Sequence, residues 1–435
     1  MKLKRLNEKT NAFITLKEEV EEAELYFSIK DNICTKDMRT TAGSKMLYNY
    51  HPPFDATVVE RIRGKGEILG KTSMDSWGFG TFGTNCDFGT PRNPWDLGRS
   101  PGGSSSGAAI VASALKERNV ALAESTGGSI SCPASFCNVF GLTPTYGLVS
   151  RWGLISYADS LDKIGLMARD LKDIALVMNY IVGGDERDPT SYQGRVPDYT
   201  RCFGEIRGLK VGVPKEYFEH VEEEVKEKVM DGISLLDSLG AEIREVSLKL
   251  TKYALASYYI IALSEASTNL ARFCGLKYGL SAEMKGEFNE YFSKVRGSGF
   301  NQESKRRIIL GTFARMAGYR GRYYLKALKV RRLIINEFKE IFSRCDLIAA
   351  PTMPILPPKF EEIEELEPIQ VYAMDQLTVG PNLAGIPMLS VPIGFSRGLP
   401  VGLHLMADHF REDLLFRVGR AIQEHTNYWR KVPEL

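Results

Sequence analysis

The sequence is poor in histidine, in paired cysteines and in long hydrophobic runs, and each lack excludes a class of protein. The five histidines are scattered and H-E-x-x-H does not occur, which argues against a metal hydrolase. The seven cysteines form no C-x-x-C pair, so we expect them to be reduced rather than part of a zinc ribbon or a disulfide framework. No run approaches the roughly 18 apolar residues of a membrane span, and no signal peptide is recognisable. We therefore expect a cytoplasmic protein that does not contact a membrane.

Net charge is also nearly absent. Lys and Arg number 56 against 54 Asp and Glu, a formal charge of +2. A chain with so little net charge has no global field that would hold nucleic acid, so any nucleic-acid handling is expected to fall to a partner. The 435 residues, 43% of them hydrophobic, suffice for one large α/β domain or two to three smaller ones.

Apolar patterns predict a chain in which strands and helices alternate. Strands are predicted at 26–29, 121–123, 209–213, 241–246, 347–350, 388–392 and 401–406. Helices are predicted at 16–25, 56–63, 108–112, 171–182, 225–236 and 412–425. The polar, Pro- and Gly-containing stretch 185–208 is linker-like, and residues 253–343 are mainly helical.

Two loops dense in glycine and serine, 101–107 and 125–129, flank the Ala-rich helical segment. Glycine lets the backbone approach closely, so that successive N–H groups can converge on an anion or a developing oxyanion. The second loop follows an apolar strand and precedes a predicted helix, which suits such a site. Flexible linkers share this composition. Because the first loop leads directly into the apolar run 108–112, we favour a site.

Two other segments resemble known catalytic or nucleotide-binding motifs but lack the surroundings that those motifs need. Gly103-x-Ser105-x-Gly107 fits the G-x-S-x-G elbow of α/β hydrolases, but the turn-rich stretch 90–101 offers no strand to build that elbow. The segment 64–72 resembles a phosphate-binding loop, yet it is one residue too long and follows no apolar strand. We therefore predict no nucleotide site in this chain.

Three short segments together resemble the amidase signature family: S-I-K-D-N around Lys30, P-G-G-S-S around Ser104, and S-T-G-G-S-I with P-A-S-F-C around Ser129. The resemblance implies an α/β fold with a large mixed β-sheet flanked by helices on both faces, forming a single catalytic domain over 1–435. It also implies catalysis without histidine. Ser129 is then the nucleophile, Ser104 the bridging serine held by a cis peptide bond, and Lys30 the base.

The chemistry of these residue types agrees with that assignment. A serine hydroxyl is a weak nucleophile that needs an adjacent base, and a lysine serves only if desolvation keeps its amine neutral. Lys30 directly follows a predicted strand, where burial is expected. The family pattern implies that the amides of Thr126, Gly127, Gly128 and Ser129 form the oxyanion hole.

Further segments, at 258–273, 305–313 and 372–385, resemble a subfamily, the A subunits of glutamyl-tRNA(Gln) amidotransferases. This resemblance implies that Tyr258, Arg307 and Asp375 bind glutamine, with Arg307 on the α-carboxylate and Asp375 on the α-ammonium. It implies a glutaminase that supplies ammonia for converting Glu-tRNA(Gln) to Gln-tRNA(Gln). Its implied partners are the B-type subunit, which binds the tRNA and uses ATP and Mg²⁺, and often a small C-type subunit. No cofactor or metal is expected in this chain itself.

The sequence departs from the family pattern at three serines. Ser76 stands where an acidic residue is usual, Ser125 where Asp is usual, and Ser131 where Arg is usual. Two alternatives stay open. A general amidase acting on other small amides would share the triad without the carboxylate clamp, and a non-catalytic scaffold would keep the fold alone, although the intact triad argues against the scaffold.

Overall fold

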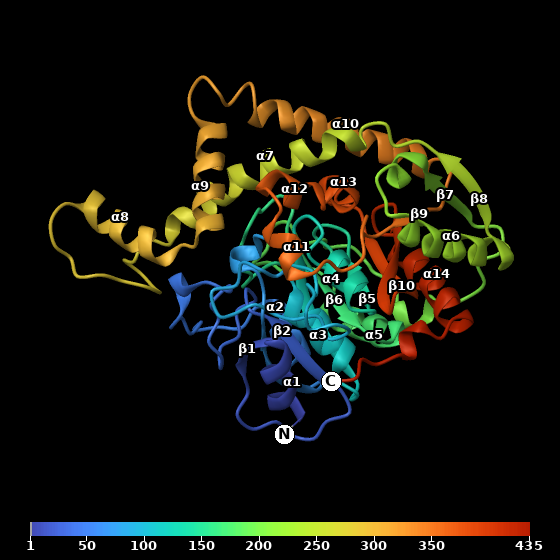
Figure 1. Cartoon of the computed structure of the whole chain (residues 1–435), viewed down its shortest axis with the longest axis horizontal. Coiled ribbons are helices and arrows are strands. Elements are labelled where there is room, and N and C mark those ends of the chain that lie inside the picture. Colours follow the sequence, from blue (N-terminus) through green and yellow to red (C-terminus); the bar gives the residue numbers. More distant parts are fainter. Residues whose placement is uncertain (1) are drawn as a thin grey trace.

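A single mixed sheet of eleven strands forms the centre of the computed structural model, which describes residues 2–435 (Figure 1). Across the sheet the strands follow the order β1 (Phe13–Leu16), β3 (Glu67–Thr72), β2 (Tyr26–Lys30), β4 (Asn119–Ser125), β6 (Lys163–Ala168), β5 (Phe140–Thr143), β10 (Met388–Ser396), β11 (Leu399–Ala407), β9 (Leu347–Pro351), β7 (Lys210–Pro214) and β8 (Glu242–Val246). The pairs β2–β3, β2–β4, β7–β8 and β7–β9 are parallel, and the others are antiparallel.

Helices cover both faces of this sheet, because alternate strand residues are apolar toward each side. One face packs against α2 (Thr57–Ile62), α5 (Leu171–Ile181), α6 (Glu223–Ser238) and α14 (Glu412–His425). The other packs against α3 (Ser106–Ala114), α4 (Ser131–Phe136), α7 (Thr251–Asn269), α10 (Tyr324–Phe342) and α13 (Gln376–Ala384). The predicted mixed sheet with helices on both faces is confirmed.

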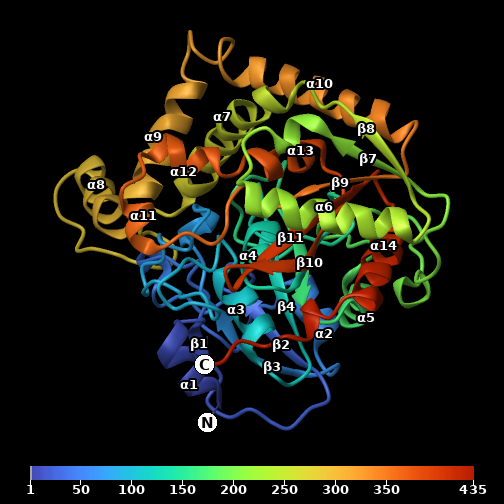
Figure 2. The same cartoon turned by 45° about the vertical axis from the view of Figure 1, so that its right-hand side comes forward.

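The predicted helical region 253–343 is confirmed and lies across one end of the molecule. Besides α7 and α10 it contains α8 (Phe288–Gly299) and α9 (Gln302–Arg315), and α8 extends away from the body (Figure 1). The remaining helices are α1 (Lys2–Thr10), α11 (Phe360–Glu364) and α12 (Pro368–Ala373). Residues of α9, α11 and α12 line a common cavity, and the three helices come together in the view turned by 45° (Figure 2).

One predicted helix is wrong. Residues 16–25 contain no helix: Leu16 ends β1, which pairs with β3, and the residues after it are irregular. Most side chains from 17 to 24 are exposed, since this acidic run has too few apolar residues to give a helix a buried face. The other predicted helices and strands are present, with ends that shift by a few residues.

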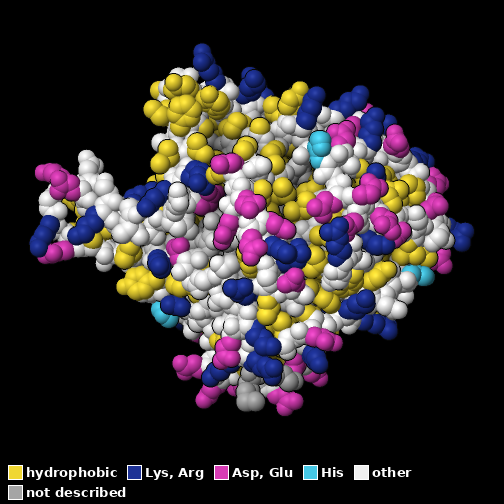
Figure 3. Space-filling view, in the orientation of Figure 1, with side chains coloured by type: hydrophobic (Ala, Val, Ile, Leu, Met, Phe, Trp, Pro, Cys, Tyr) yellow, Lys and Arg dark blue, Asp and Glu magenta, His cyan; other side chains and the backbone are white. Residues whose placement is uncertain are grey.

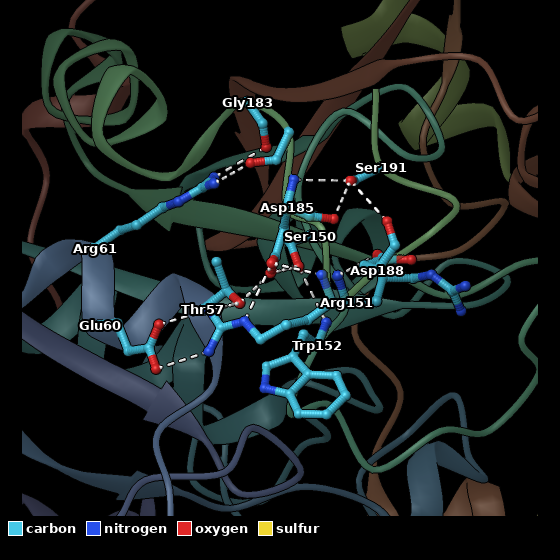
Figure 4. Close-up of polar contacts among 12 residues, drawn as sticks. Thr57, Glu60, Arg61, Ser150, Arg151, Trp152, Gly183, Asp185, Asp188 and Ser191 are labelled. Atoms are coloured by element: carbon cyan, nitrogen blue, oxygen red, sulfur yellow. Dashed lines mark hydrogen bonds and ion pairs between the residues drawn. The ribbon is translucent and has the colours of Figure 1, made fainter. Parts of the chain in front are cut away.

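Hydrogen bonds fix the start of the stretch 185–208 to the body of the molecule (Figure 4). The Asp185 carboxylate accepts from the hydroxyl groups of Thr57 and Ser150, the latter at 2.7 Å. Arg61 donates to the carbonyl oxygens of the four residues 181–184. The sheet continues beyond this stretch through β7 and β8.

Basic and acidic side chains are interspersed on the face shown in Figure 3, in keeping with the small net charge. Hydrophobic side chains gather on that face where α9 leads toward α10. They include Phe313, Met316, Tyr319 and Tyr323, all at least 38% exposed. Among residues 2–435, no helix combines the length and the apolar composition needed to cross a membrane.

Candidate active site

The site begins where the parallel strands β2 and β4 end side by side. Lys30 is the last residue of β2, and its side chain is completely buried. Its Nζ lies 2.8 Å from Ser104 Oγ, 2.8 Å from Glu124 Oε2 and 2.9 Å from the Glu124 carbonyl oxygen. A lysine ammonium has three N–H donors, so these three acceptors satisfy it fully. The predicted contact between Lys30 and Ser104 is therefore present.

The loop 101–107 holds Ser104 against this lysine. The peptide bond between Gly103 and Ser104 is cis. The Thr81 carbonyl accepts a hydrogen bond from the Gly103 amide at 2.6 Å, and the Asp75 amide donates to the Ser104 carbonyl at 3.2 Å. The Asp75 carboxylate accepts from two further backbone amides, and burial raises its pKa to about 6. Ser104 is thus fixed by backbone on both sides.

Ser129 lies in the second loop, next to the first. The Ser105 amide donates to the Ser129 carbonyl at 3.3 Å, which joins the two loops. Ser129 is 7% exposed whereas Lys30 and Ser104 are 0% exposed, so Ser129 alone of these three can be reached from outside. Within residues 2–435, the amides of Thr126, Gly127, Gly128 and Ser129 have no acceptor of the chain's own. Free amides beside an accessible hydroxyl can stabilise a tetrahedral oxyanion.

Neither the G-x-S-x-G match at 103–107 nor the segment 64–72, which resembles a phosphate-binding loop, forms the site that its motif would require. Ser105 directly precedes α3, no strand leads into it, and its Oγ donates to the Glu124 carbonyl at 2.9 Å. Gly70 and Lys71 lie inside strand β3. Lys71 is buried, donates to the Ile33 carbonyl at 2.6 Å and to Thr40 Oγ1 at 2.8 Å, and burial lowers its pKa to about 8.

Glycine is required in the second loop because aromatic and hydroxyl side chains press against it. A side chain at Gly127 would overlap the ring of Tyr258, and one at Gly128 would overlap the Thr378 hydroxyl group. Thr378 in turn donates to the carbonyl oxygen of Asp375 at 3.1 Å. The predicted substrate residues Tyr258 and Asp375 therefore adjoin the loop that carries Ser129.

Arg307 occupies an aromatic cage close by. Its Nε lies 2.7 Å from Glu303 Oε1, and its Nη1 donates to the Tyr157 hydroxyl at 2.8 Å. The guanidinium carbon lies 4.9 to 5.9 Å from the ring centroids of four aromatic residues, Phe79, Tyr157, Tyr259 and Tyr372. Its Nη2 has no acceptor among residues 2–435. The Nη2 group of the Arg307 guanidinium is therefore left to bind an anionic ligand.

Asp375 is tied to the same cage. Its Oδ2 accepts from the Tyr259 hydroxyl at 2.6 Å, and its Oδ1 accepts from Thr81 at 3.0 Å. Burial raises the pKa of Asp375, against the hydrogen bonds from Tyr259 and Thr81. Tyr259 thus lies between the cation and the carboxylate, and a cavity of about 840 Å³ reaches Arg307 from outside.

The sequence reasoning missed the residues that complete these groups. Glu124 binds Lys30, Glu303 binds Arg307, and Tyr259 joins Arg307 to Asp375. Glu124 offered a signal, because it is an acid that directly follows the apolar run 120–123 of β4. Glu303 also offered one, since it precedes Arg307 by one helical turn.

The three serines that depart from the family pattern have different surroundings. Ser76 Oγ lies 2.6 Å from the Gly43 carbonyl oxygen and 2.8 Å from the Asn85 carbonyl oxygen, and it donates its one hydrogen to one of the two. Ser131 Oγ lies 3.3 Å from His404 Nε2. Ser125 Oγ is buried without a hydrogen-bond partner in the described part of the chain.

The fold and these loops place the chain in a known class of protein. Residues 23–416 match the Amidase family, and the chain belongs to that family. The relatives it resembles are named as the A subunits of glutamyl-tRNA(Gln) amidotransferases. One, from Geobacillus sp. (strain WCH70), is 49% identical over 94% of this chain and 84% of its own length. Another, from Methanosarcina mazei, is 48% identical over 93% of this chain and 85% of its own length.

A solved structure of the same kind agrees. Among solved A subunits of glutamyl-tRNA(Gln) amidotransferases, the one from Thermotoga maritima superposes with a TM-score of 0.85 at 40% identity, over 99% of this chain and 92% of that one. The resemblance to this subfamily and the α/β amidase signature fold are thereby confirmed.

Proposed function

We propose that this chain is the glutaminase subunit of a tRNA-dependent amidotransferase and that Ser129, Ser104 and Lys30 carry its chemistry. The observation that supports this most is the buried hydrogen bond between Lys30 and Ser104, in a loop whose Ser105 amide is bonded to Ser129, an accessible serine with free amides. The names of the relatives supply the reaction: an amidotransferase for glutamyl-tRNA(Gln).

The mechanism starts with a proton relay. Lys30, acting as a neutral amine, takes the proton of Ser104 while Ser104 takes that of Ser129. The Ser129 oxygen attacks the side-chain carbonyl of glutamine, and the amides of 126–129 stabilise the oxyanion. The relay returns the proton to the departing nitrogen, which leaves as ammonia. Water then hydrolyses the γ-glutamyl ester by the same relay.

Glutamine is held in this proposal by the cage around Arg307. The free Nη2 of Arg307 binds the α-carboxylate, while Asp375 accepts from the α-ammonium. Tyr258 packs on Gly127 of the nucleophile loop, and its ring centroid lies 5.0 Å from that of Tyr259, whose hydroxyl group donates to Asp375.

Loss of the clamp should weaken glutamine binding more than it slows the chemistry. We expect Arg307→Gln and Asp375→Asn each to raise KM by about 10²-fold, because each leaves one charge of the substrate unpaired in a closed site, which costs about 2–5 kcal/mol. Steady-state hydrolysis of glutamine measures KM and kcat. Arg315→Gln is the matched control, since Arg315 lies on the same helix but donates to Ser267 instead. An unchanged KM in both clamp variants would refute the clamp.

The partners are also proposed. We assign tRNA binding and the use of ATP and Mg²⁺ to the B-type subunit, with a small C-type subunit where one exists, and place the complex in the cytoplasm. The chain needs no cofactor of its own for glutamine hydrolysis. Its small net charge supports this division, because nothing in it would attract tRNA over a distance.

Glutamine hydrolysis by the isolated chain tests this assignment. We expect slow hydrolysis by the chain alone and stimulation by the B-type subunit with ATP and Glu-tRNA(Gln), since uncoupled hydrolysis wastes glutamine. Ammonia release, followed with and without these components, gives the answer. Hydrolysis that is indifferent to all of them, or a preference for other small amides, would favour a free-standing amidase.

A further inference from the structure

A carboxyl group lies buried against the lysine of the relay. The side chains of Lys30 and Glu124 are 0% and 1% exposed, and Nζ lies 2.8 Å from Oε2. Burying two opposite charges is costly even when they are paired. Moving one proton across this hydrogen bond removes both charges, because it leaves a neutral amine beside a neutral carboxyl group.

We propose that Glu124 takes a proton from Lys30 and so gives the relay its free amine. This inference rests on the proposed roles of Lys30, Ser104 and Ser129. It makes Glu124 a positioning residue that acts through the lysine, without touching the substrate.

The contacts of the second carboxyl oxygen of Glu124, Oε1, support the proposal that Glu124 receives this proton. Thr126 Oγ1 lies 2.8 Å from Glu124 Oε1 and 2.8 Å from Asp162 Oδ1. The Thr126 hydroxyl group has one hydrogen and can donate it to only one of these two carboxyl groups. The second carboxyl group must therefore carry a proton of its own, which it donates to Thr126 Oγ1. Burial, and then the neighbouring charge of Glu124, raises the pKa of Asp162. Asp162 thus adds no second negative charge, and the Thr126 hydroxyl remains free to donate to Glu124.

The remaining neighbours leave the pair isolated from water. Asn32 Nδ2 donates to Glu124 Oε2 at 3.1 Å. Gly78 lies beside the pair: a Cβ atom at this position would lie 3.6 Å from Glu124 Oε2, from Ser104 Oγ and from the ring of Tyr157. Burial raises the pKa of the Tyr157 phenol to about 12, so that group stays neutral at neutral pH.

One more charge acts on this pair. Asp75 interacts electrostatically with Lys30, and burial raises its pKa to about 6. Any titration of Asp75 affects the enzyme whether or not Glu124 is changed.

Every proton that moves in the proposed reaction has a donor and an acceptor. At the start the pair shares one proton, as an ion pair or as neutral amine and acid. When Ser129 forms its bond to the glutamine carbonyl carbon, its proton passes to Ser104, and that of Ser104 passes to Lys30. The pair then holds two protons, one on each residue. When the C–N bond breaks, the departing nitrogen takes one proton back and the pair returns to its starting state.

The shape of the pH profile distinguishes this role from a purely structural one. Because the proton of the amine passes to Glu124 within the pair, wild-type acylation needs no proton loss to solvent. In Glu124→Gln, Lys30 must lose its proton to solvent before it can act. The ratio of variant to wild-type rate should then rise by about tenfold per pH unit from pH 5 until the amine is deprotonated. Using the ratio cancels the effect of Asp75, which both proteins share.

The experiment measures acylation by a glutamine analogue at saturating concentration between pH 5 and 9. The Gln side chain introduced at position 124 fits there, because its carbonyl oxygen can accept hydrogen bonds from Lys30 and Asn32 while its amide group donates to Thr126. Glu124→Asp keeps a carboxyl group and should keep a flat ratio at a lower rate. If Glu124→Gln fails to fold, the wild-type profile decides instead, and a rise of about tenfold per unit above pH 6 would contradict the proposal.

A rate ratio that is the same at every pH would show that Glu124 only supports the structure. That result is distinct from a failure of the proposed function, in which wild-type protein would not be acylated or Ser129→Ala would be acylated normally.

Discussion

Replacing Ser129 by Ala is expected to abolish glutamine hydrolysis, with a loss on the order of 10⁴-fold or more in kcat. Ser129 is the one accessible hydroxyl group of the proposed relay, and it lies among the free amides of 126–129. The other two hydroxyl groups of this loop, those of Ser125 and Thr126, are at most 1% exposed. Covalent trapping by an acylating glutamine analogue, read by mass spectrometry of the intact chain, should also disappear.

Ser105→Ala is the matched control for this loss. Ser105 lies beside Ser104, but its hydroxyl group donates to the Glu124 carbonyl inside the protein. Its loss should cost about 1 kcal/mol of stability and leave trapping in place. Loss of trapping in Ser105→Ala with trapping retained in Ser129→Ala would reverse the assignment in favour of an α/β-hydrolase serine.

The three residues of the proposed relay could be named from the sequence because each lies in a short local motif. The strand before Lys30 and the glycines before Ser104 and Ser129 are local features that sequence patterns record. The same patterns located most strands and helices. They failed at 16–25, where charged residues with good helix propensity had no apolar face to bury.

The surroundings of the relay and the clamp could not be predicted in the same way. Glu124 meets Lys30 because β2 and β4 pair in parallel with a register that matches Ile29 to Leu122. The cage of Arg307 takes its rings from four separate segments, at 79, 157, 259 and 372. Contacts of this kind depend on the register and packing of distant segments, which no local motif contains.

Replacing Lys30 by Met is expected to remove activity and also to destabilise the fold. Met matches the length of the lysine chain but leaves the buried Glu124 without its cation. Removing one partner of a buried ion pair costs about 3–5 kcal/mol. The lone carboxylate must take up a proton to stay buried, and this uptake becomes harder as pH rises above about 4.3, the ordinary pKa of a glutamic acid in an unfolded chain. The deficit in the free energy of unfolding should therefore grow between about pH 5 and 8.

Urea unfolding of Lys30→Met and of Lys30→Met with Glu124→Gln separates the two effects. Gln removes the charge while keeping hydrogen-bond partners for Asn32 and Thr126, so the double variant should regain most of the lost stability and lose the dependence on pH. It should not regain glutamine hydrolysis, because the relay still lacks its base. A double variant no more stable than Lys30→Met would show that the loss comes from altered packing around the new thioether side chain rather than from the unpaired carboxylate. Activity in either variant would show that Lys30 is not the base.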